Sequence, residues 1–285
     1  MTSASRTPLR IARVRPLDAP ADREPEAFFV ACDADNFEAP EGRRWTVTTT
    51  PFPASPSNAA SPGRPGWEEG DVVDQSSFAF LSPCVPANVL GMAHNTGAAG
   101  RALPPQAFHK AATSVIGQGD AIEVPADSRV EPEAELAIVV GRRARGLTLD
   151  SAMDAVLGFT IGNDVTDRAA QATDELWISA KSADTFSPLG PWIVTRRPGA
   201  DAEVRVAIDG EPLPAGRIAD LGWGLEEILV YASSLMTLHP GDAILSGFPG
   251  AAAPIVAGNV VECSVGGIGT LRNRVIAVPV SSPSA

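Results

Sequence analysis

Short apolar segments separated by turns fill the chain beyond residue 84, and this pattern limits the fold more than any other feature of the sequence. Segments of this length between turn residues predict strands rather than helices. Helical signals are fewer, at Leu225–Ser234 and at Ser151–Val156, which Asp150 precedes as an N-cap. The pattern predicts a mainly β, α+β fold with a rolled or barrel-like sheet and helices at its rim. The predicted strands are Asn88–Ala93, Ala121–Val124, Glu133–Val140, Val156–Ile161, Trp192–Thr195, Glu203–Ile208, Ala243–Ser246, Val260–Val265 and Val275–Val280.

Residues 1–84 are patterned differently and predict a small N-terminal region, with a larger domain over residues 85–285. Strands are expected at Ala27–Cys32 and Trp45–Thr49, and the Pro-, Ser- and Gly-rich stretch Pro51–Asp71 predicts a long loop. A chain of 285 residues with 44% hydrophobic content suits one substantial domain with a smaller one attached.

The net charge and the cysteine content limit the class of binding partner and the cellular compartment. A net charge of −12 argues against nucleic acid or an anionic membrane as partner, because both require a basic face. Three widely spaced cysteines without a CxxC pair fit a reducing compartment. The first residues, "MTSASRTPLRIARVRPL", contain no apolar core of a secretory signal, and prolines interrupt the uncharged stretch Gln75–Gly100. We therefore expect a soluble cytoplasmic protein that binds small molecules and metal ions.

Three glutamates open the predicted strand in "EPEAELAIVVG", at positions 131, 133 and 135. Alternate residues of a strand share a face, so the three carboxylates would lie roughly 7 Å apart on one face, with the apolar residues facing a core. On a solvated face this arrangement costs little. In a cleft, each carboxylate would have to be protonated or find a cation.

A second acidic point follows in "GFTIGNDVTDRAAQ", where a predicted strand ends beside Asp164. Two glutamates from one strand and an aspartate from another form an all-oxygen set, which suits Mg²⁺, Mn²⁺ or Ca²⁺ better than Zn²⁺. Such an ion would neutralise the repelling carboxylates. Of the 22 basic residues only Lys110 and Lys181 are lysines, so a retained lysine indicates a role that arginine cannot fill.

Glu133-x-Glu135, Asp164-x-Thr166, Arg168, Gln171, Lys181, "SPLGPWI" and "LHPGDAILSGFPG" together resemble the fumarylacetoacetate hydrolase family. The resemblance covers roughly residues 86–280, and the family's central signature is present almost in full. It implies a β-roll catalytic domain, a homodimer, and one Mg²⁺ or Mn²⁺, with Ca²⁺ as an alternative, held by Glu133, Glu135 and Asp164. It also implies small 2-oxo or 1,3-dicarbonyl acids as substrates.

The resemblance assigns further roles. Lys181 would be catalytic, while Arg168 and Gln171 would contact the substrate. Lys110 lies in a segment similar to the family's F-x-K-x-x-S and would also bind substrate. Glu131 is not a family ligand and is expected to be a solvated charge.

Two departures from the family concern the activation of water and the anchoring of substrate. Smaller members carry N-Y-x-x-H-x-x-E, whose His and Glu activate the attacking water, but Gly97 and Gly100 stand at those positions here. A glycine cannot accept a proton. His94, three positions earlier, is the alternative catalytic residue. Phe248 replaces a threonine that holds a substrate carboxylate in the family.

The leading hypothesis is a Mg²⁺- or Mn²⁺-dependent hydrolase that cleaves a C–C bond in an acylpyruvate-like or 1,3-dicarbonyl oxo acid. The absent His and Glu leave two alternatives open. One is a decarboxylase or isomerase acting on a related 2-oxo acid through a metal enolate, which needs no attacking water. The other is a catalytically degenerate homologue that binds metal and acid.

Overall fold

A computed structural model describes residues 9–17, 27–33, 44–52, 67–126 and 128–279. Its β-strands in these ranges are β1 Leu9–Pro16, β2 Phe28–Asp33, β3 Arg44–Thr48, β4 Val72–Asp74, β5 Phe78–Phe80, β6 Val89–Ala93, β7 Gln106–Lys110, β8 Val115–Ile116, β9 Ala121–Pro125, β10 Val130–Glu131, β11 Ala134–Val140, β12 Val156–Asn163, β13 Thr166–Asp167, β14 Ser187–Val194, β15 Glu203–Ile208, β16 Glu211–Pro212, β17 Gly216–Arg217, β18 Ala243–Leu245, β19 Val260–Val265 and β20 Gly269–Val278. Its α-helices are α1 Gly97–Ala102, α2 Arg168–Gln171, α3 Ile178–Lys181 and α4 Leu225–Leu235.

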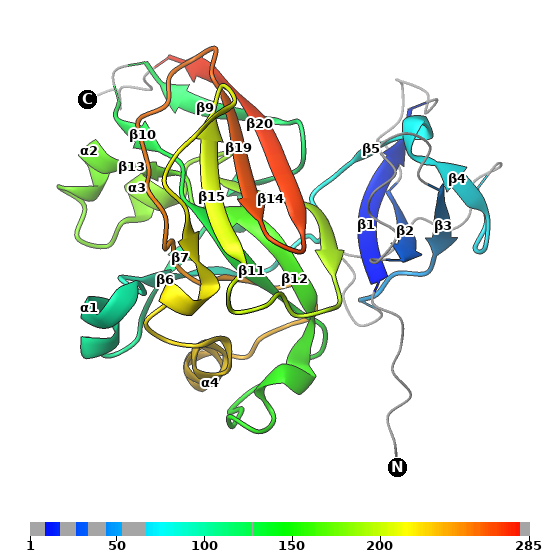
Figure 1. Ribbon diagram of the computed structural model, residues 1–285, viewed down its shortest axis with the longest axis horizontal. Coiled ribbons are helices and arrows are strands. Elements are labelled where there is room, and N and C mark those ends of the chain that lie inside the picture. The colour runs from blue at the N-terminus through cyan, green and yellow to red at the C-terminus, as the bar shows by residue number, and fades with distance from the viewer. Residues whose placement is uncertain (1–8, 18–26, 34–43, 53–66, 127, 280–285) are drawn as a thin grey trace, which may run out of the picture.

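Two large sheets form the main layers (Figure 1). The first follows the order β4-β3-β2-β1-β14-β12-β11-β18-β6-β7, and the second the order β16-β15-β19-β20-β9. They pack together where β11, β12 and β14 contact β15, β19 and β20. The short pair β10-β13, with α2 and α3, lies at one end of this stack. This arrangement confirms the predicted mainly β, α+β fold.

The strands of the N-terminal region belong to the first sheet. β1 pairs with β14 through Arg10 opposite Val194 and Ile11 opposite Ile193, so the sheet continues from the early strands into the later ones. Beside this junction the rings of Trp45, Phe80 and Trp192 pack together, with centroids 5.6 to 6.0 Å apart. The division of the chain at Cys84 stays a prediction.

β11 is buried on both faces, which explains its unbroken apolar sequence. Ala134, Leu136, Ile138 and Val140 enter the main core. On the opposite face Ala137 and Val139 enter a second apolar cluster. The predicted core face of the strand is therefore confirmed, although the strand begins one residue later than expected. The glutamate face is not a solvated edge.

Helix α4 confirms the prediction at Leu225–Ser234, and its buried residues recur at helical spacing. Its first turn is capped by Glu227, whose carboxylate accepts a 2.9 Å hydrogen bond from the backbone N–H of Gly224.

The helix predicted at Ser151–Val156 is wrong in type: a 3-10 helix spans Ala152–Ala155, and Val156 already begins β12. The few residues before β12 therefore form a single 3-10 turn and not an α-helix.

The sequence patterns did not predict β1, β7 or α1. In β1 the arginines obscure the apolar pattern, although Arg10 is buried beside the ring of Trp192. Two glycines weaken the helical pattern of α1. The expected loop Pro51–Asp71 lies largely outside the described residues, as does the end of Val275–Val280, whose described part belongs to β20. Within the described ranges, no helix has the length and apolar content needed to span a membrane.

Candidate metal centre

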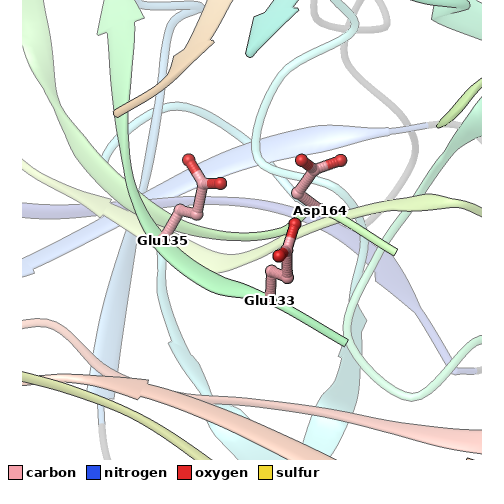
Figure 2. A group of neighbouring side chains, drawn as sticks. All are labelled: Glu133, Glu135 and Asp164. Atoms are coloured by element: carbon pink, nitrogen blue, oxygen red, sulfur yellow. The ribbon is translucent and has the colours of Figure 1, made fainter. Parts of the chain in front are cut away.

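Three carboxylates converge where β11 and β12 meet the short strands. Glu133 directly precedes β11, Glu135 lies within it, and Asp164 follows β12. The antiparallel register sets Ala134 opposite Asn163, and the backbone N–H of Asp164 donates to the carbonyl of Glu133 at 2.9 Å. One oxygen from each carboxylate lies within 4.8 Å of the others. Figure 2 shows the three groups pointing into the same space.

Two buried lysines hold Asp164 from either side. Lys110 Nζ lies 2.6 Å from one carboxylate oxygen and Lys181 Nζ 2.5 Å from the other. Lys181 also donates to Glu133 at 3.1 Å and to the hydroxyl of Thr166 at 2.7 Å. Burial opposes ionisation of Asp164, but the two ammonium groups outweigh it and hold the pKa of Asp164 below its usual value.

Glu135 is buried, and its negative charge is the least compensated of the three carboxylates. Its carboxylate accepts a 2.5 Å hydrogen bond from the backbone N–H of Gly247, and no ion pair reaches it from the described residues. Burial, followed by repulsion from Asp164 and Glu133, raises the pKa of Glu135 well above its usual value. A hard divalent cation among the three carboxylates would remove this penalty, so the donor set fits Mg²⁺ or Mn²⁺.

The expectation of a solvated Glu131 is wrong. Glu131 is only 6% exposed, and its carboxylate bridges Arg129 at 2.6 Å and Arg168 at 2.8 Å. Burial opposes ionisation, but the two arginines outweigh it and lower the pKa of Glu131. Glu131 thus helps to hold Arg168, which also contacts Glu133 at 2.7 Å. No signal in the sequence distinguished this role from a surface charge.

A cavity of about 320 Å³ opens above the carboxylates. Arg168 donates to the side-chain carbonyl of Gln171 at 3.0 Å, so both residues are oriented together from α2. Their neighbours in the wall include Phe248 and Phe108. The predicted site residues that line this cavity are His94, Glu133, Glu135, Asp164, Arg168, Gln171 and Lys181.

Lys110 lies outside this wall. Its side chain is fully buried, and its ammonium donates to Asp164 and to the backbone carbonyl of Val165 at 3.2 Å. Burial lowers its pKa, although Asp164 counteracts part of that shift. Direct substrate contact, the role expected for Lys110, does not fit this placement, because an ammonium without exposed surface cannot meet a solute. Its position beside Asp164 fits a positioning role instead.

His94, Asn95 and Thr96, which precede α1, line the cavity, whereas Gly97 and Gly100 within α1 do not. Gly97 begins α1 with φ at +60°, and Gly100 packs so closely that a Cβ there would lie 2.2 Å from the backbone oxygen of His94. His94 lines the cavity, but within the described part of the chain its imidazole has no hydrogen-bond partner. The buried Asn95 holds this segment by donating to the carbonyl of Ser246 at 2.7 Å.

Several wall residues were missed by sequence reasoning, chiefly Phe108, Trp177 and Asn95. Aromatic residues in short apolar segments are more often part of a core, so no separate signal distinguished Phe108 and Trp177 as wall residues. Gly247 was also missed. Its φ is +107°, and a Cβ added to it would lie 3.0 Å from Asn95, so a side chain there would be strained and crowded, while its N–H donates to Glu135.

The family model for the C-terminal region of fumarylacetoacetate hydrolase matches residues 83–276. The chain belongs to the fumarylacetoacetate hydrolase family.

Known relatives include proteins of different activities. A Mycobacterium tuberculosis protein is 42% identical over 176 residues, which cover 60% of this chain and 66% of that protein. The mitochondrial oxaloacetate tautomerase of Xenopus laevis is 34% identical over 185 residues, covering 60% of this chain and 58% of that enzyme. These matches therefore span less than two thirds of each relative.

The structure of a 5-carboxymethyl-2-hydroxymuconate delta-isomerase from Mycobacterium smegmatis is similar over almost the whole chain. The TM-score is 0.79 at 32% identity, with 94% of this chain and 100% of the isomerase covered. The similarity includes the early strands as well as the fumarylacetoacetate hydrolase region. The family thus contains enzymes named as hydrolases, isomerases and tautomerases, and membership alone does not choose among them.

Proposed function

We propose that this protein is a Mg²⁺- or Mn²⁺-dependent enzyme that converts a small oxo acid by moving a proton or releasing CO₂ through an enolate. The observation that carries the proposal is the set of buried Glu135 and Asp164 with half-buried Glu133, beside Lys181 in one cavity. A divalent ion held by these three residues would polarise the substrate's oxo group.

The charge of the site supports an anionic substrate. The described residues contribute four carboxylates and four cationic side chains to the cluster: Glu131, Glu133, Glu135 and Asp164 with Lys110, Lys181, Arg129 and Arg168. A bound divalent cation would leave an excess of positive charge, which attracts a carboxylate.

Three cavity residues, and Lys110 outside the cavity, then have roles in binding or stabilisation. The ammonium of Lys181 would stabilise negative charge as it develops on the substrate's oxygen. Arg168 and Gln171, oriented by Glu131 and by each other, would bind the substrate carboxylate. Lys110 would keep Asp164 ionised and in place from behind, without touching the substrate.

Hydrolysis of a C–C bond, which the sequence favours first, is the second candidate. It requires a base that activates water, and Gly100 cannot carry the missing glutamate without displacing the backbone of His94. His94 alone lacks an orienting carboxylate. A reaction that needs no attacking water fits this geometry better, and the Xenopus laevis relative bears the name of such an activity, oxaloacetate tautomerase.

The test is to assay the protein with Mn²⁺ against oxaloacetate and acetylpyruvate in parallel. We expect enol-to-keto conversion or decarboxylation of oxaloacetate that Lys181→Ala abolishes. Acetylpyruvate hydrolysis should be slower by about 100- to 10,000-fold, the usual contribution of a general base. Acetylpyruvate hydrolysis as fast as the oxaloacetate reaction would restore the hydrolase hypothesis, and inactivity on both with intact metal binding would favour a degenerate homologue.

From the family resemblance we also propose a homodimer. Light scattering on the purified protein tests it, and a mass of one chain, 29.5 kDa, would contradict it.

A further inference from the structure

A separate cavity, the hairpin cavity, lies at the turn between β19 and β20. It has a volume of about 320 Å³, and its wall is formed by Arg10 of β1, by Glu203 and Arg205 of β15, and by residues 264–270 of the hairpin. None of these residues lines the cavity above the three carboxylates. A ligand of the hairpin cavity would therefore be bound by a different set of side chains.

Arg10 brings a buried positive charge to the hairpin cavity. It shares a face of β1 with Ala12 and Val14, which enter the main core, and it is only 3% exposed. Its guanidinium lies 5.3 Å from the centre of the Trp192 ring, and the indole N–H of Trp192 donates to the carbonyl of Ile268 in the turn at 2.9 Å. The same ring thus contacts both the guanidinium and the turn. An arginine carries several N–H donors, so it can bind an anion in addition to the contacts that it already makes.

The second sheet adds a cation and two hydroxyl groups in one row. The strand register places Arg205 opposite Ser264, and Ser264 opposite Thr270, so the three side chains lie beside one another on the same face of the sheet. All three line the hairpin cavity, and each can donate a hydrogen bond to an oxyanion. Such a row, together with Arg10, suits a ligand with several acceptor oxygens.

The hairpin cavity is positively charged within a protein of net charge −12. Over the residues that the structure describes, its wall contains two guanidinium groups and one carboxylate, that of Glu203, which pairs with Arg205 at 2.7 Å. The side chains of Glu203 and Arg205 are 53% and 36% exposed, so water screens this pair and the pair is weak. An anion that also contacts Arg10 could therefore share Arg205 with Glu203.

Glycines leave the backbone of the turn accessible. Gly267 and Gly269 line the hairpin cavity with φ of +81° and +144°, which explains why the turn itself requires glycine. A Cβ added at Gly267 would meet no atom within 4 Å, so the space beside this part of the backbone is open. A ligand can approach the turn without displacing a side chain.

We propose that the hairpin cavity is a second binding site, which takes a small phosphate-bearing molecule. A phosphate group presents its acceptor oxygens tetrahedrally and carries more negative charge than a carboxylate, so it can accept from both guanidinium groups and from the hydroxyl groups together. The volume of about 320 Å³ lies at the lower end of the range for small-molecule sites and leaves room for an organic group beside the phosphate. This inference does not depend on the proposed function, because the two cavities share no wall residue.

Calorimetric titration of the full chain with inorganic phosphate tests the site, with Mg²⁺ present and chloride keeping the ionic strength constant. Arg205→Gln should weaken phosphate binding by about tenfold or more, the effect of losing one charge-assisted hydrogen bond. The matched control is Arg272→Gln, because Arg272 is also a surface arginine of this sheet, pairs with Glu262 at 3.5 Å, and does not line the hairpin cavity. The control should bind phosphate as the parent does. Equal affinities in the two variants, or no binding by the parent at millimolar phosphate, would overturn the inference.

Two further titrations identify the place and the class of the ligand. Arg168→Gln removes a cation from the cavity above the carboxylates and should leave the Arg205-dependent phosphate binding unchanged. Phosphate binding that is lost in Arg168→Gln but kept in Arg205→Gln would belong to that cavity and would overturn the inference. Succinate should bind the hairpin cavity at least about tenfold more weakly than phosphate. Equal or tighter succinate binding that depends on Arg205 would contradict a phosphate site.

Thermal unfolding tests the role of the buried Arg10. A ligand that binds only the folded chain raises its unfolding temperature, so phosphate should stabilise the parent and Arg272→Gln but not Arg10→Gln. If Arg10→Gln does not fold, the comparison of Arg205→Gln with Arg272→Gln decides alone. An equal rise in unfolding temperature in a folded Arg10→Gln protein would show that the phosphate binds elsewhere and would overturn the inference.

Discussion

The carboxylate cluster and the α1 segment, residues 94–102, are built in different ways, although both contribute to the wall of one cavity, the second through His94, Asn95 and Thr96. In the cluster, strands set Glu133, Glu135 and Asp164 in place, and two buried lysines pair with Asp164 and Glu133. In the α1 segment, polar groups serve the loop itself: Asn95 bonds to the backbone near β18, and glycines remove side chains. The comparison teaches that the proposed metal site is fixed by the sheet, whereas the segment where the family resemblance places a water-activating pair depends on a local loop.

The largest expected effect is that of Asp164→Ala. Removing the shared partner of two buried ammonium groups should abolish Mn²⁺ binding and all turnover, and should lower the free energy of unfolding by about 3–5 kcal/mol. Calorimetric titration with Mn²⁺ and urea denaturation measure the two effects, with the exposed Asp150→Ala as control. Undiminished Mn²⁺ binding by Asp164→Ala would show that the carboxylate cluster is not the metal site.

Next in size is the exchange of Lys181 for arginine. A planar guanidinium cannot make the three short contacts of the ammonium with Glu133, Asp164 and Thr166, so kcat should fall by about 100-fold or more, nearly as far as in Lys181→Ala. The measurement is kcat at saturating metal, on whichever of oxaloacetate and acetylpyruvate the parent protein converts. Near-normal turnover by Lys181→Arg would show that only a positive charge is needed.

A smaller effect should distinguish the two glycines of α1. Gly100→Ala should cost about 1–3 kcal/mol of stability, because the new methyl group meets the backbone oxygen of His94 at 2.2 Å. Gly97→Ala meets no atom within 4 Å, so only its left-handed conformation opposes the change, at about 1–2 kcal/mol. Denaturant midpoints compare the two variants, and a Gly100→Ala protein as stable as the parent would indicate a segment free to move.

The same contact predicts the outcome of restoring the family pair. The double variant Gly97→His with Gly100→Glu should fail to raise acetylpyruvate hydrolysis, because the glutamate cannot fit without displacing α1. A marked rise in hydrolysis would show that the α1 segment rearranges around a substrate. The α1 segment would then contribute to the reaction as the carboxylate cluster does.

The smallest effect belongs to the surface contact that ties α1 to α4. Arg101 pairs with Glu227 at 2.8 Å and lies over the ring of Trp223 at 4.0 Å, but half of its side chain is exposed. Solvent screening limits such a pair, so Arg101→Ala should cost less than about 1 kcal/mol. Thermal unfolding against the parent protein checks this value, and a loss comparable to that of Asp164→Ala would contradict the distinction between buried and surface pairs.

The sequence by itself determined the features that depend on local pattern and residue chemistry. Alternation and apolar runs predicted β11, β12, β15 and β19, since side chains of a strand alternate between its faces. Three acidic residues indicated an oxygen-ligand metal site, and the scarcity of lysine indicated a specific role for Lys181. The structure brings these four residues into one cavity, although their roles stay predictions.

The tertiary structure decided what depends on neighbours distant in the chain. Glu131 is buried because Arg168 lies across a strand pair from it, and Lys110 sits behind Asp164 rather than in the cavity. The rings of His94, Phe108 and Trp177 meet although they come from the residue after β6, from β7 and from the residue before α3, which no local pattern connects. The physical reason is that burial and pairing are set by the packing of the whole chain, whereas strand propensity and ligand chemistry are carried by the residues themselves.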